Sequence, residues 1–119
     1  MERFLFICLG GAIGTGLRYL TASLAVRWLG VDFPYGTLIV NLSGAAVLGF
    51  LTGLALAPEE ALLAGTAAVG SYTTFSTWMF ETQRLGEDRQ VRHLVANLAV
   101  SLVAGVALAA AGRWAGAHL

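Results

Sequence analysis

The stretch Gly70-Ser-Tyr-Thr-Thr-Phe-Ser-Thr77 lies inside the apolar segment Ala61–Phe80, which contains no charged residue. Besides Tyr72 it carries five Ser or Thr residues, which compete for backbone hydrogen bonds, and a glycine, which adds conformational freedom. Non-helical backbone at membrane depth is tolerated only where protein buries it or where it lines a cavity. The stretch therefore predicts a membrane helix that is broken near its middle. The alternative is an intact helix whose polar face packs against its neighbours.

Three further apolar segments are suited to crossing the ~30 Å hydrocarbon core of a bilayer, which takes about 20 helical residues. They are Phe4–Leu29, which is interrupted by Arg18, then Tyr35–Leu56 and Leu94–Ala111. The 119 residues are 57% hydrophobic and 12% charged, whereas about 25% of an ordinary soluble domain is charged. The sequence thus predicts an all-α membrane protein with four transmembrane helices in a single domain, residues 1–119, and excludes a large soluble catalytic domain.

The charges give little guidance on orientation. The formal net charge is zero, so no basic patch indicates a nucleic-acid partner. The charged stretch Glu81–Arg92 is expected to be an interfacial loop. One side of the predicted membrane carries Arg3 and Arg113, and the other carries Arg27, Arg84, Arg89 and Arg92. The positive-inside rule gives only a weak bias from such counts. Two readings stay open: one fixed orientation with the arginine-rich loops in the cytoplasm, or a chain that inserts both ways.

Polar and small residues recur at helical spacing inside the apolar segments. The stripes are Gly10, Gly14 and Arg18; Thr37, Asn41, Gly44, Leu48 and Thr52; and His93, Asn97, Ser101 and Gly105. Glycines at this spacing let membrane helices approach closely. Two Asn residues on separate helices indicate either hydrogen bonds between helices or a lined pathway. Arg18 either snorkels toward the interface or gives a positive potential to an aqueous vestibule, and we favour the vestibule.

The polar and charged residues within the predicted spans indicate that any transported ion is an anion. No Asp or Glu lies in the middle of any predicted span, whereas a cation pathway or a proton-coupled exporter usually needs a membrane carboxylate. Amides, hydroxyls, aromatic ring edges and one arginine remain, and these groups are mostly donors or carry partial positive charge. The set suits a small anion better than a cation. No catalytic motif is present, so we do not expect an enzyme.

Three motifs in the first three segments resemble the Fluc (CrcB) family of fluoride channels. They are Gly10-Gly-Ala-Ile-Gly-Thr-Gly-Leu-Arg-Tyr19, Gly36-Thr-Leu-Ile-Val-Asn-Leu-Ser-Gly44 and the stretch from Gly70 to Thr77. The resemblance implies a passive channel in the inner (plasma) membrane that expels fluoride and confers fluoride resistance. It implies an antiparallel, dual-topology dimer with two pores. It also implies a structural sodium ion (Na⁺) at the dimer centre, held by the main-chain carbonyls of Gly70 and Thr73 from both chains.

The resemblance also assigns the ion path residue by residue. Asn41 matches the pore asparagine, Phe75 the first aromatic, Thr77 and Ser101 the hydroxyl track, and Arg18 the arginine near the vestibule. Two positions of the path depart from the family pattern: Trp78 stands where a second phenylalanine is common, and Asn97 where some members have tyrosine. These departures would also suit pairing with a complementary subunit, but the intact motifs favour a homodimer.

Two other classes compete with the channel. A small four-helix multidrug exporter would need a proton-coupling carboxylate within a span. A membrane assembly subunit without transport would use the polar stripes only to join helices.

Overall fold

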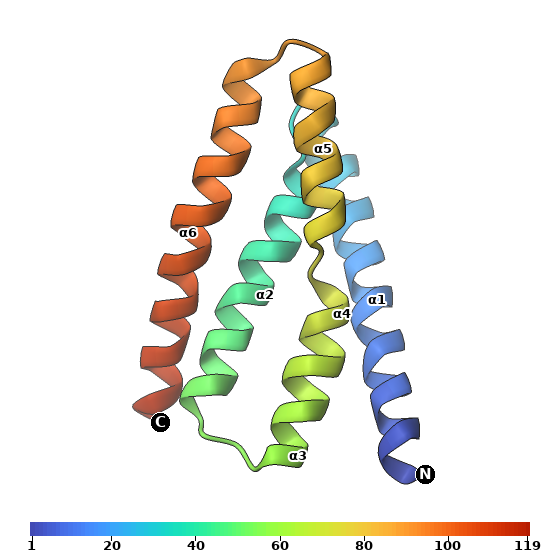
Figure 1. Ribbon diagram of the computed structural model, residues 1–119, viewed down its shortest axis with the longest axis vertical. Coiled ribbons are helices and arrows are strands. Elements are labelled where there is room, and N and C mark those ends of the chain that lie inside the picture. Colours follow the sequence, from blue (N-terminus) through green and yellow to red (C-terminus); the bar gives the residue numbers. More distant parts are fainter.

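The computed structural model describes all 119 residues, and every regular element in it is helical, as predicted. The elements are α1 (Glu2–Leu29), α2 (Tyr35–Gly53), α3 (Pro58–Ala61), the π-helical segment η1 (Leu62–Val69), α4 (Gly70–Tyr72), α5 (Phe75–Glu87) and α6 (Val91–Ala117). Figure 1 shows that α1 runs the length of the molecule, α2 returns, the segment from α3 to α5 crosses again, and α6 returns. Both termini therefore lie at the same end.

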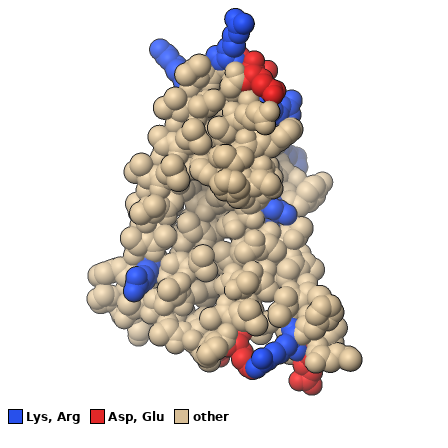
Figure 2. Space-filling model, viewed as in Figure 1, with Lys and Arg blue, Asp and Glu red and all other residues tan.

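The dimensions and surface of the molecule suit a bilayer. Its longest extent is 47 Å, close to the ~40–45 Å of a bilayer with its headgroups. Helices α1, α2 and α6 are each long and apolar enough to cross a membrane. Figure 2 shows charged side chains gathered mainly at the two ends, with a largely uncharged belt between them. Trp28 and Trp114 are exposed near helix ends, where aromatic residues sit at membrane interfaces. These features describe a membrane protein.

The predicted interfacial loop Glu81–Arg92 is wrong over most of its length. Helix α5 continues to Glu87 and α6 begins at Val91, so only residues 88–90 connect the two helices. The charged residues of α5 lie on a helix whose other face is covered, because Thr82 and Leu85 are buried. Charge alone was therefore a poor guide, since the underlying pattern is that of an amphipathic helix.

Other predicted boundaries also shift. Helix α2 ends at Gly53, three residues before the predicted Leu56. The chain turns there, with Ala55 at a left-handed φ of 51°, and Pro58 starts α3, since proline suits the first turn of a helix. The predicted span Leu94–Ala111 is too short at both ends, because α6 runs from Val91 to Ala117. The predicted third span, Ala61–Phe80, is distributed over α3, η1, α4 and the first half of α5.

Helices α2 and α6 run parallel in contact, backbone against backbone. A Cβ atom added to Gly49 would overlap the carbonyl oxygen of Ala109, and one added to Gly112 would overlap that of Ala46. Gly53 and Gly116 approach the opposite helix in the same way. Small residues at this spacing allow membrane helices to pack at the closest distance. We call these four glycines the α2–α6 seam; they fix α2 in place and, with it, the polar residues along α2.

Two residues separate α4 from α5. Thr73 has a ψ of 161°, and Thr74 has φ and ψ of −149° and 122°, so both are extended. The hydroxyl of Thr74 then accepts a hydrogen bond from the Thr77 N–H at 3.3 Å and caps the start of α5. We refer to Thr73 and Thr74 as the interruption.

Candidate functional site

The side-chain amide of Asn41 on α2 forms two hydrogen bonds with the backbone of the interruption. Its Nδ2 donates to the carbonyl oxygen of Thr74 at 2.9 Å, and the Thr74 N–H donates to Asn41 Oδ1 at 2.8 Å. Both backbone groups of Thr74 are thus satisfied by one side chain from another helix. An amide carries two donor hydrogens, and the second hydrogen on Asn41 Nδ2 has no protein acceptor.

The interruption deprives two carbonyls of their usual donors. In an α-helix the N–H of each residue donates to the carbonyl four residues earlier, so Thr74 would serve Gly70 and Thr77 would serve Thr73. Here the Thr74 N–H donates to Asn41 Oδ1, and the Thr77 N–H donates to Thr74 Oγ1. The carbonyls of Gly70 and Thr73 therefore lack their helical donors. These are the two carbonyls that the family resemblance assigns to a sodium ion.

Arg18 lines a hollow shared by three helices. The hollow has a volume of about 290 Å³ and lies between α1, α2 and α5. Its walls are formed by Thr15, Arg18, Tyr19, Ala22, Thr37, Val40, Thr74 and Thr77. The structure thus brings Arg18 together with Thr77 and with one residue of the interruption. A guanidinium and several hydroxyls around one cavity offer donors and positive charge to an anion.

The two aromatic residues of the predicted path are neighbours on α5. The rings of Phe75 and Trp78 pack edge to face, with centroids 5.7 Å apart. Phe75 is 70% exposed in the single chain, whereas Trp78 is half-buried. The Trp78 indole N–H donates a long hydrogen bond of 3.4 Å to the carbonyl of Asn97 on α6. The α6 helix therefore holds Trp78, while Phe75 is free on the surface.

Asn97 is the most buried polar side chain, with no exposed area. Its Nδ2 donates to Thr82 Oγ1 of α5 at 2.9 Å, but its Oδ1 has no partner. One turn further along α6, the hydroxyl of Ser101 is also buried without a partner. Buried polar atoms normally make hydrogen bonds, so these two atoms mark a place where a polar species fits between α6 and its surroundings.

Comparison with known proteins places the chain in a family. Residues 5–113 match the family described as "CrcB-like protein, Camphor Resistance (CrcB)". The chain belongs to the CrcB family. It is 59% identical to "Fluoride-specific ion channel FluC 2" of Mycobacterium tuberculosis over 91% of this chain and 86% of that protein. It is 42% identical to "Fluoride-specific ion channel FluC 1" of Geobacillus kaustophilus, over 97% and 95% of the two chains. It is 40% identical to "Fluoride-specific ion channel FluC" of Anaeromyxobacter sp., over 96% and 98%.

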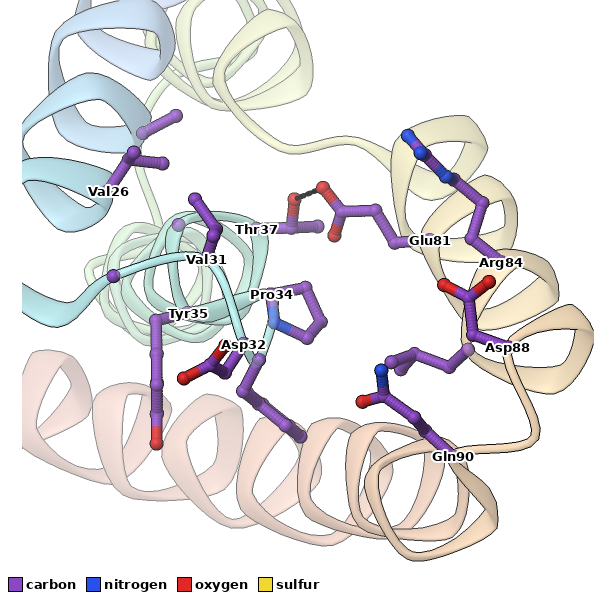
Figure 3. A pocket seen from close by; sticks show the side chains of 15 residues that line it. Val26, Val31, Asp32, Pro34, Tyr35, Thr37, Glu81, Arg84, Asp88 and Gln90 are labelled. Carbon is purple, nitrogen blue, oxygen red and sulfur yellow. Dashed lines mark hydrogen bonds between the residues drawn. The ribbon is translucent and has the colours of Figure 1, made fainter.

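One contact of this CrcB chain was missed from the sequence. The Thr37 hydroxyl donates to Glu81 Oε1 at 3.0 Å, and Figure 3 shows the two side chains pointing toward each other in the wall of a second hollow of about 460 Å³. Thr37 lines both hollows, so this pair stands between them. Thr37 belongs to the α2 stripe that contains Asn41, which was the available signal. The charge of the stretch Glu81–Arg92 predicts a loop, whereas Glu81 lies half-buried on α5.

The structure gathers the predicted residues of this CrcB chain into two groups. Asn41 and Phe75 lie at the interruption, where Thr77 and Arg18 meet at the nearby hollow. Trp78, Asn97 and Ser101 belong to the contact between α5 and α6. The two groups are joined by the edge-to-face contact of Phe75 with Trp78.

Proposed function

We propose that the protein is a fluoride-selective channel that lets fluoride leave the cell passively and so confers resistance to this ion. The observation that carries the proposal is the meeting of Arg18, Thr74 and Thr77 in one hollow, beside the amide of Asn41. These groups offer positive charge and hydrogen-bond donors. Relatives 40–59% identical to this chain bear the name of a fluoride-specific ion channel, which supports fluoride as the ion.

The proposed path replaces the water shell of fluoride in steps. Arg18 raises the concentration of anions at the mouth. The second hydrogen of the Asn41 amide donates next, followed by the partly positive edge of the Phe75 ring. Thr77 and Ser101 supply hydroxyl donors, and Ser101 has no competing protein partner. Each contact must be strong enough to replace water and weak enough to release the ion.

Trp78 and Asn97 form the α6 side of the proposed path. Trp78 contributes a second aromatic edge in contact with Phe75. Asn97 donates to Thr82 and accepts from the Trp78 indole through its carbonyl, so it orients both residues. The single indole N–H of Trp78 is taken by the Asn97 carbonyl, so in this proposal Trp78 offers fluoride the partly positive edge of its ring.

The proposed working unit is an antiparallel homodimer of dual topology in the inner (plasma) membrane, with two separate pores. Two arginines near one end and four near the other give only a weak orientation bias. Phe75 and Gly70 are exposed on the single chain at the interruption, where a second copy would cover them. In this proposal the segment from α3 to α5 forms the third crossing, with the interruption at mid-membrane depth. A paralogous partner is the alternative to a second copy.

A sodium ion at the centre of the dimer is part of the proposal. The carbonyls of Gly70 and Thr73 fit such an ion, because their helical donors are taken by Asn41 Oδ1 and Thr74 Oγ1. Freed backbone carbonyls are good ligands for a hard monovalent cation. When bound, the ion supplies a fixed positive charge that offsets the cost of bringing anions into the membrane.

Fluoride efflux from liposomes tests the proposed function. The purified chain alone is reconstituted, and a fluoride electrode records efflux, with chloride efflux as the selectivity control. We expect fluoride efflux that needs no pH gradient and no other protein, and chloride efflux at background. Asn41→Ala and Phe75→Ile should each reduce the fluoride rate about tenfold or more, since one lost contact of about 1.4 kcal/mol is worth that factor. Unchanged rates in both variants would refute the assigned path.

A further inference from the structure

We propose that Asn41 is also a positioning residue for the cation site: it keeps the interruption open, and so keeps the carbonyl of Gly70 available. This inference rests on the proposed function, because the cation belongs to that proposal. The geometry that carries it is the pair of hydrogen bonds between the Asn41 amide and the backbone of Thr74, at 2.8 and 2.9 Å.

The Thr74 N–H has two competing acceptors. One is the carbonyl of Gly70, which it would meet in a continuous helix, and the other is Asn41 Oδ1, which it does meet. Backbone donors at membrane depth must be satisfied within the protein. Without the Asn41 acceptor, the protein acceptor that a continuous helix offers to the Thr74 N–H is the Gly70 carbonyl, so the balance shifts toward closing the helix onto Gly70. Closure would remove that carbonyl from a cation.

Asn41 also provides a hydrogen-bond partner for the carbonyl of Thr74. Its Nδ2 satisfies the Thr74 carbonyl, so both backbone groups of this residue are paired in the extended form. The hydroxyl of Thr74 then takes the Thr77 N–H, which frees the carbonyl of Thr73. One amide on α2 therefore favours the conformation in which both carbonyls are free.

A second observation places α2 firmly against the interruption. A Cβ atom on Gly44, one turn after Asn41, would overlap the Cγ2 atom of Thr73. The absence of a side chain at Gly44 thus makes room for Thr73, and Asn41 forms hydrogen bonds with Thr74. Helix α2 therefore contacts both residues of the interruption. The α2–α6 seam holds α2 in this position through Gly49 and Gly53. The open form is therefore imposed from α2 and does not rest on the local sequence alone.

The test measures Na⁺ binding as well as flux on the purified full chain. Na⁺ binding is measured with radioactive Na⁺, and the Na⁺-dependent rise in melting temperature is measured against choline at equal ionic strength. In Asn41→Ala we expect the Na⁺ affinity to fall about tenfold or more, because apparent affinity falls with the fraction of chains in the competent form. Asn41→Asp keeps an acceptor for the Thr74 N–H, so it should retain Na⁺ binding while losing fluoride flux.

Ser43→Ala is the matched control. Ser43 lies two residues along α2, and its hydroxyl bonds to Ile39, Val40 and Tyr72 and not to the interruption. It should keep both Na⁺ binding and flux. The melting temperature in choline shows whether each variant is folded.

The outcomes separate the two proposals. Wild-type Na⁺ affinity in a folded Asn41→Ala variant would overturn the positioning role, even if its fluoride flux is lost. No Na⁺ binding by the wild-type chain would overturn it as well, while leaving fluoride conduction standing. Na⁺ binding that depends on Asn41 in a chain that passes no fluoride would support the positioning role and refute the proposed function.

Discussion

The buried amide of Asn97 on α6 donates to the hydroxyl of Thr82 on α5 across 2.9 Å. Thr82 in turn donates to the carbonyl of Trp78 one turn earlier, at 2.7 Å, and the Trp78 indole returns to the Asn97 carbonyl at 3.4 Å. This closed circuit of three residues is the polar connection between α5 and α6. It fixes the half of the third crossing that follows the interruption.

Removing the Asn97 amide should loosen α5. Asn97→Leu loses the bond to Thr82, and hydrogen bonds between membrane helices contribute about 0.6 kcal/mol on average and up to about 1.7. We expect destabilisation in this range, because the Asn97 Oδ1 atom is unpaired already and its removal costs nothing. Chemical unfolding in detergent measures the change. Val103→Ala, at an exposed position of α6, should have a much smaller effect. Equal stability of the two variants would contradict the role of the circuit.

The α2–α6 seam should tolerate no side chain at Gly112. Gly112→Ala places a Cβ atom into the Ala46 carbonyl, so the two backbones must separate and lose contact along the seam. Overpacking of this kind typically costs about 1–3 kcal/mol. The control on the same helix is Gly105→Ala, whose nearest neighbour is the end of the Leu42 side chain at 3.9 Å. The melting temperatures of both variants are compared. An equal drop in melting temperature at the two positions would contradict the close packing of the α2–α6 seam.

The contribution of Arg18 should depend on ionic strength. If its positive charge concentrates fluoride at the mouth, Arg18→Gln should slow efflux most at low salt, and the difference should shrink as the Debye length falls from about 30 Å at 0.01 M to about 8 Å at 0.15 M. Arg18→Lys keeps the charge and serves as the control. Efflux at the two salt concentrations, with sulfate salts added, gives the comparison. A loss in Arg18→Gln that is the same at both concentrations would indicate a structural role for Arg18.

The hydrogen bond from Thr37 to Glu81 should affect the rate of fluoride efflux through the negative charge of the Glu81 carboxylate. Thr37→Val removes the only hydrogen-bond donor to Glu81, whose other carboxylate oxygen has no partner. The carboxylate then presents more uncompensated negative charge between the two hollows, so fluoride efflux should fall. The double variant Thr37→Val, Glu81→Gln removes that charge and should recover much of the rate. If it recovers none, the loss comes from altered packing of Thr37.

The sequence was informative about features that repeat locally and silent about partners that meet only in the fold. Low charge and apolar length predicted the long helices, and the spacing of Thr37, Asn41 and Gly44 predicted one polar face of α2. The partner of Asn41 was not predictable, because Thr74 lies 33 positions away and presents backbone groups that have no sequence signature. The same holds for Thr82, which Asn97 reaches across 15 positions.

Glu81 shows a different limit. Its charged neighbours predict a loop, but the buried face of α5, which includes Thr82 and Leu85, decides the local structure. Hydropathy along the chain averages over the two faces of such a helix and therefore hides it. The hydroxyl-rich stretch before Thr77 carries a different kind of signal, because Ser and Thr compete for the backbone hydrogen bonds of a helix wherever they occur.

Both termini lie at the same end of the molecule, where α1 begins and α6 ends (Figure 1). In the proposed antiparallel pair, the last residue of one copy and the first residue of the other are in opposite compartments. A tandem gene encoding both copies as one polypeptide would therefore need a linker that itself crosses the bilayer, about 20 apolar residues long. A flexible hydrophilic linker would force the two copies to insert with the same orientation.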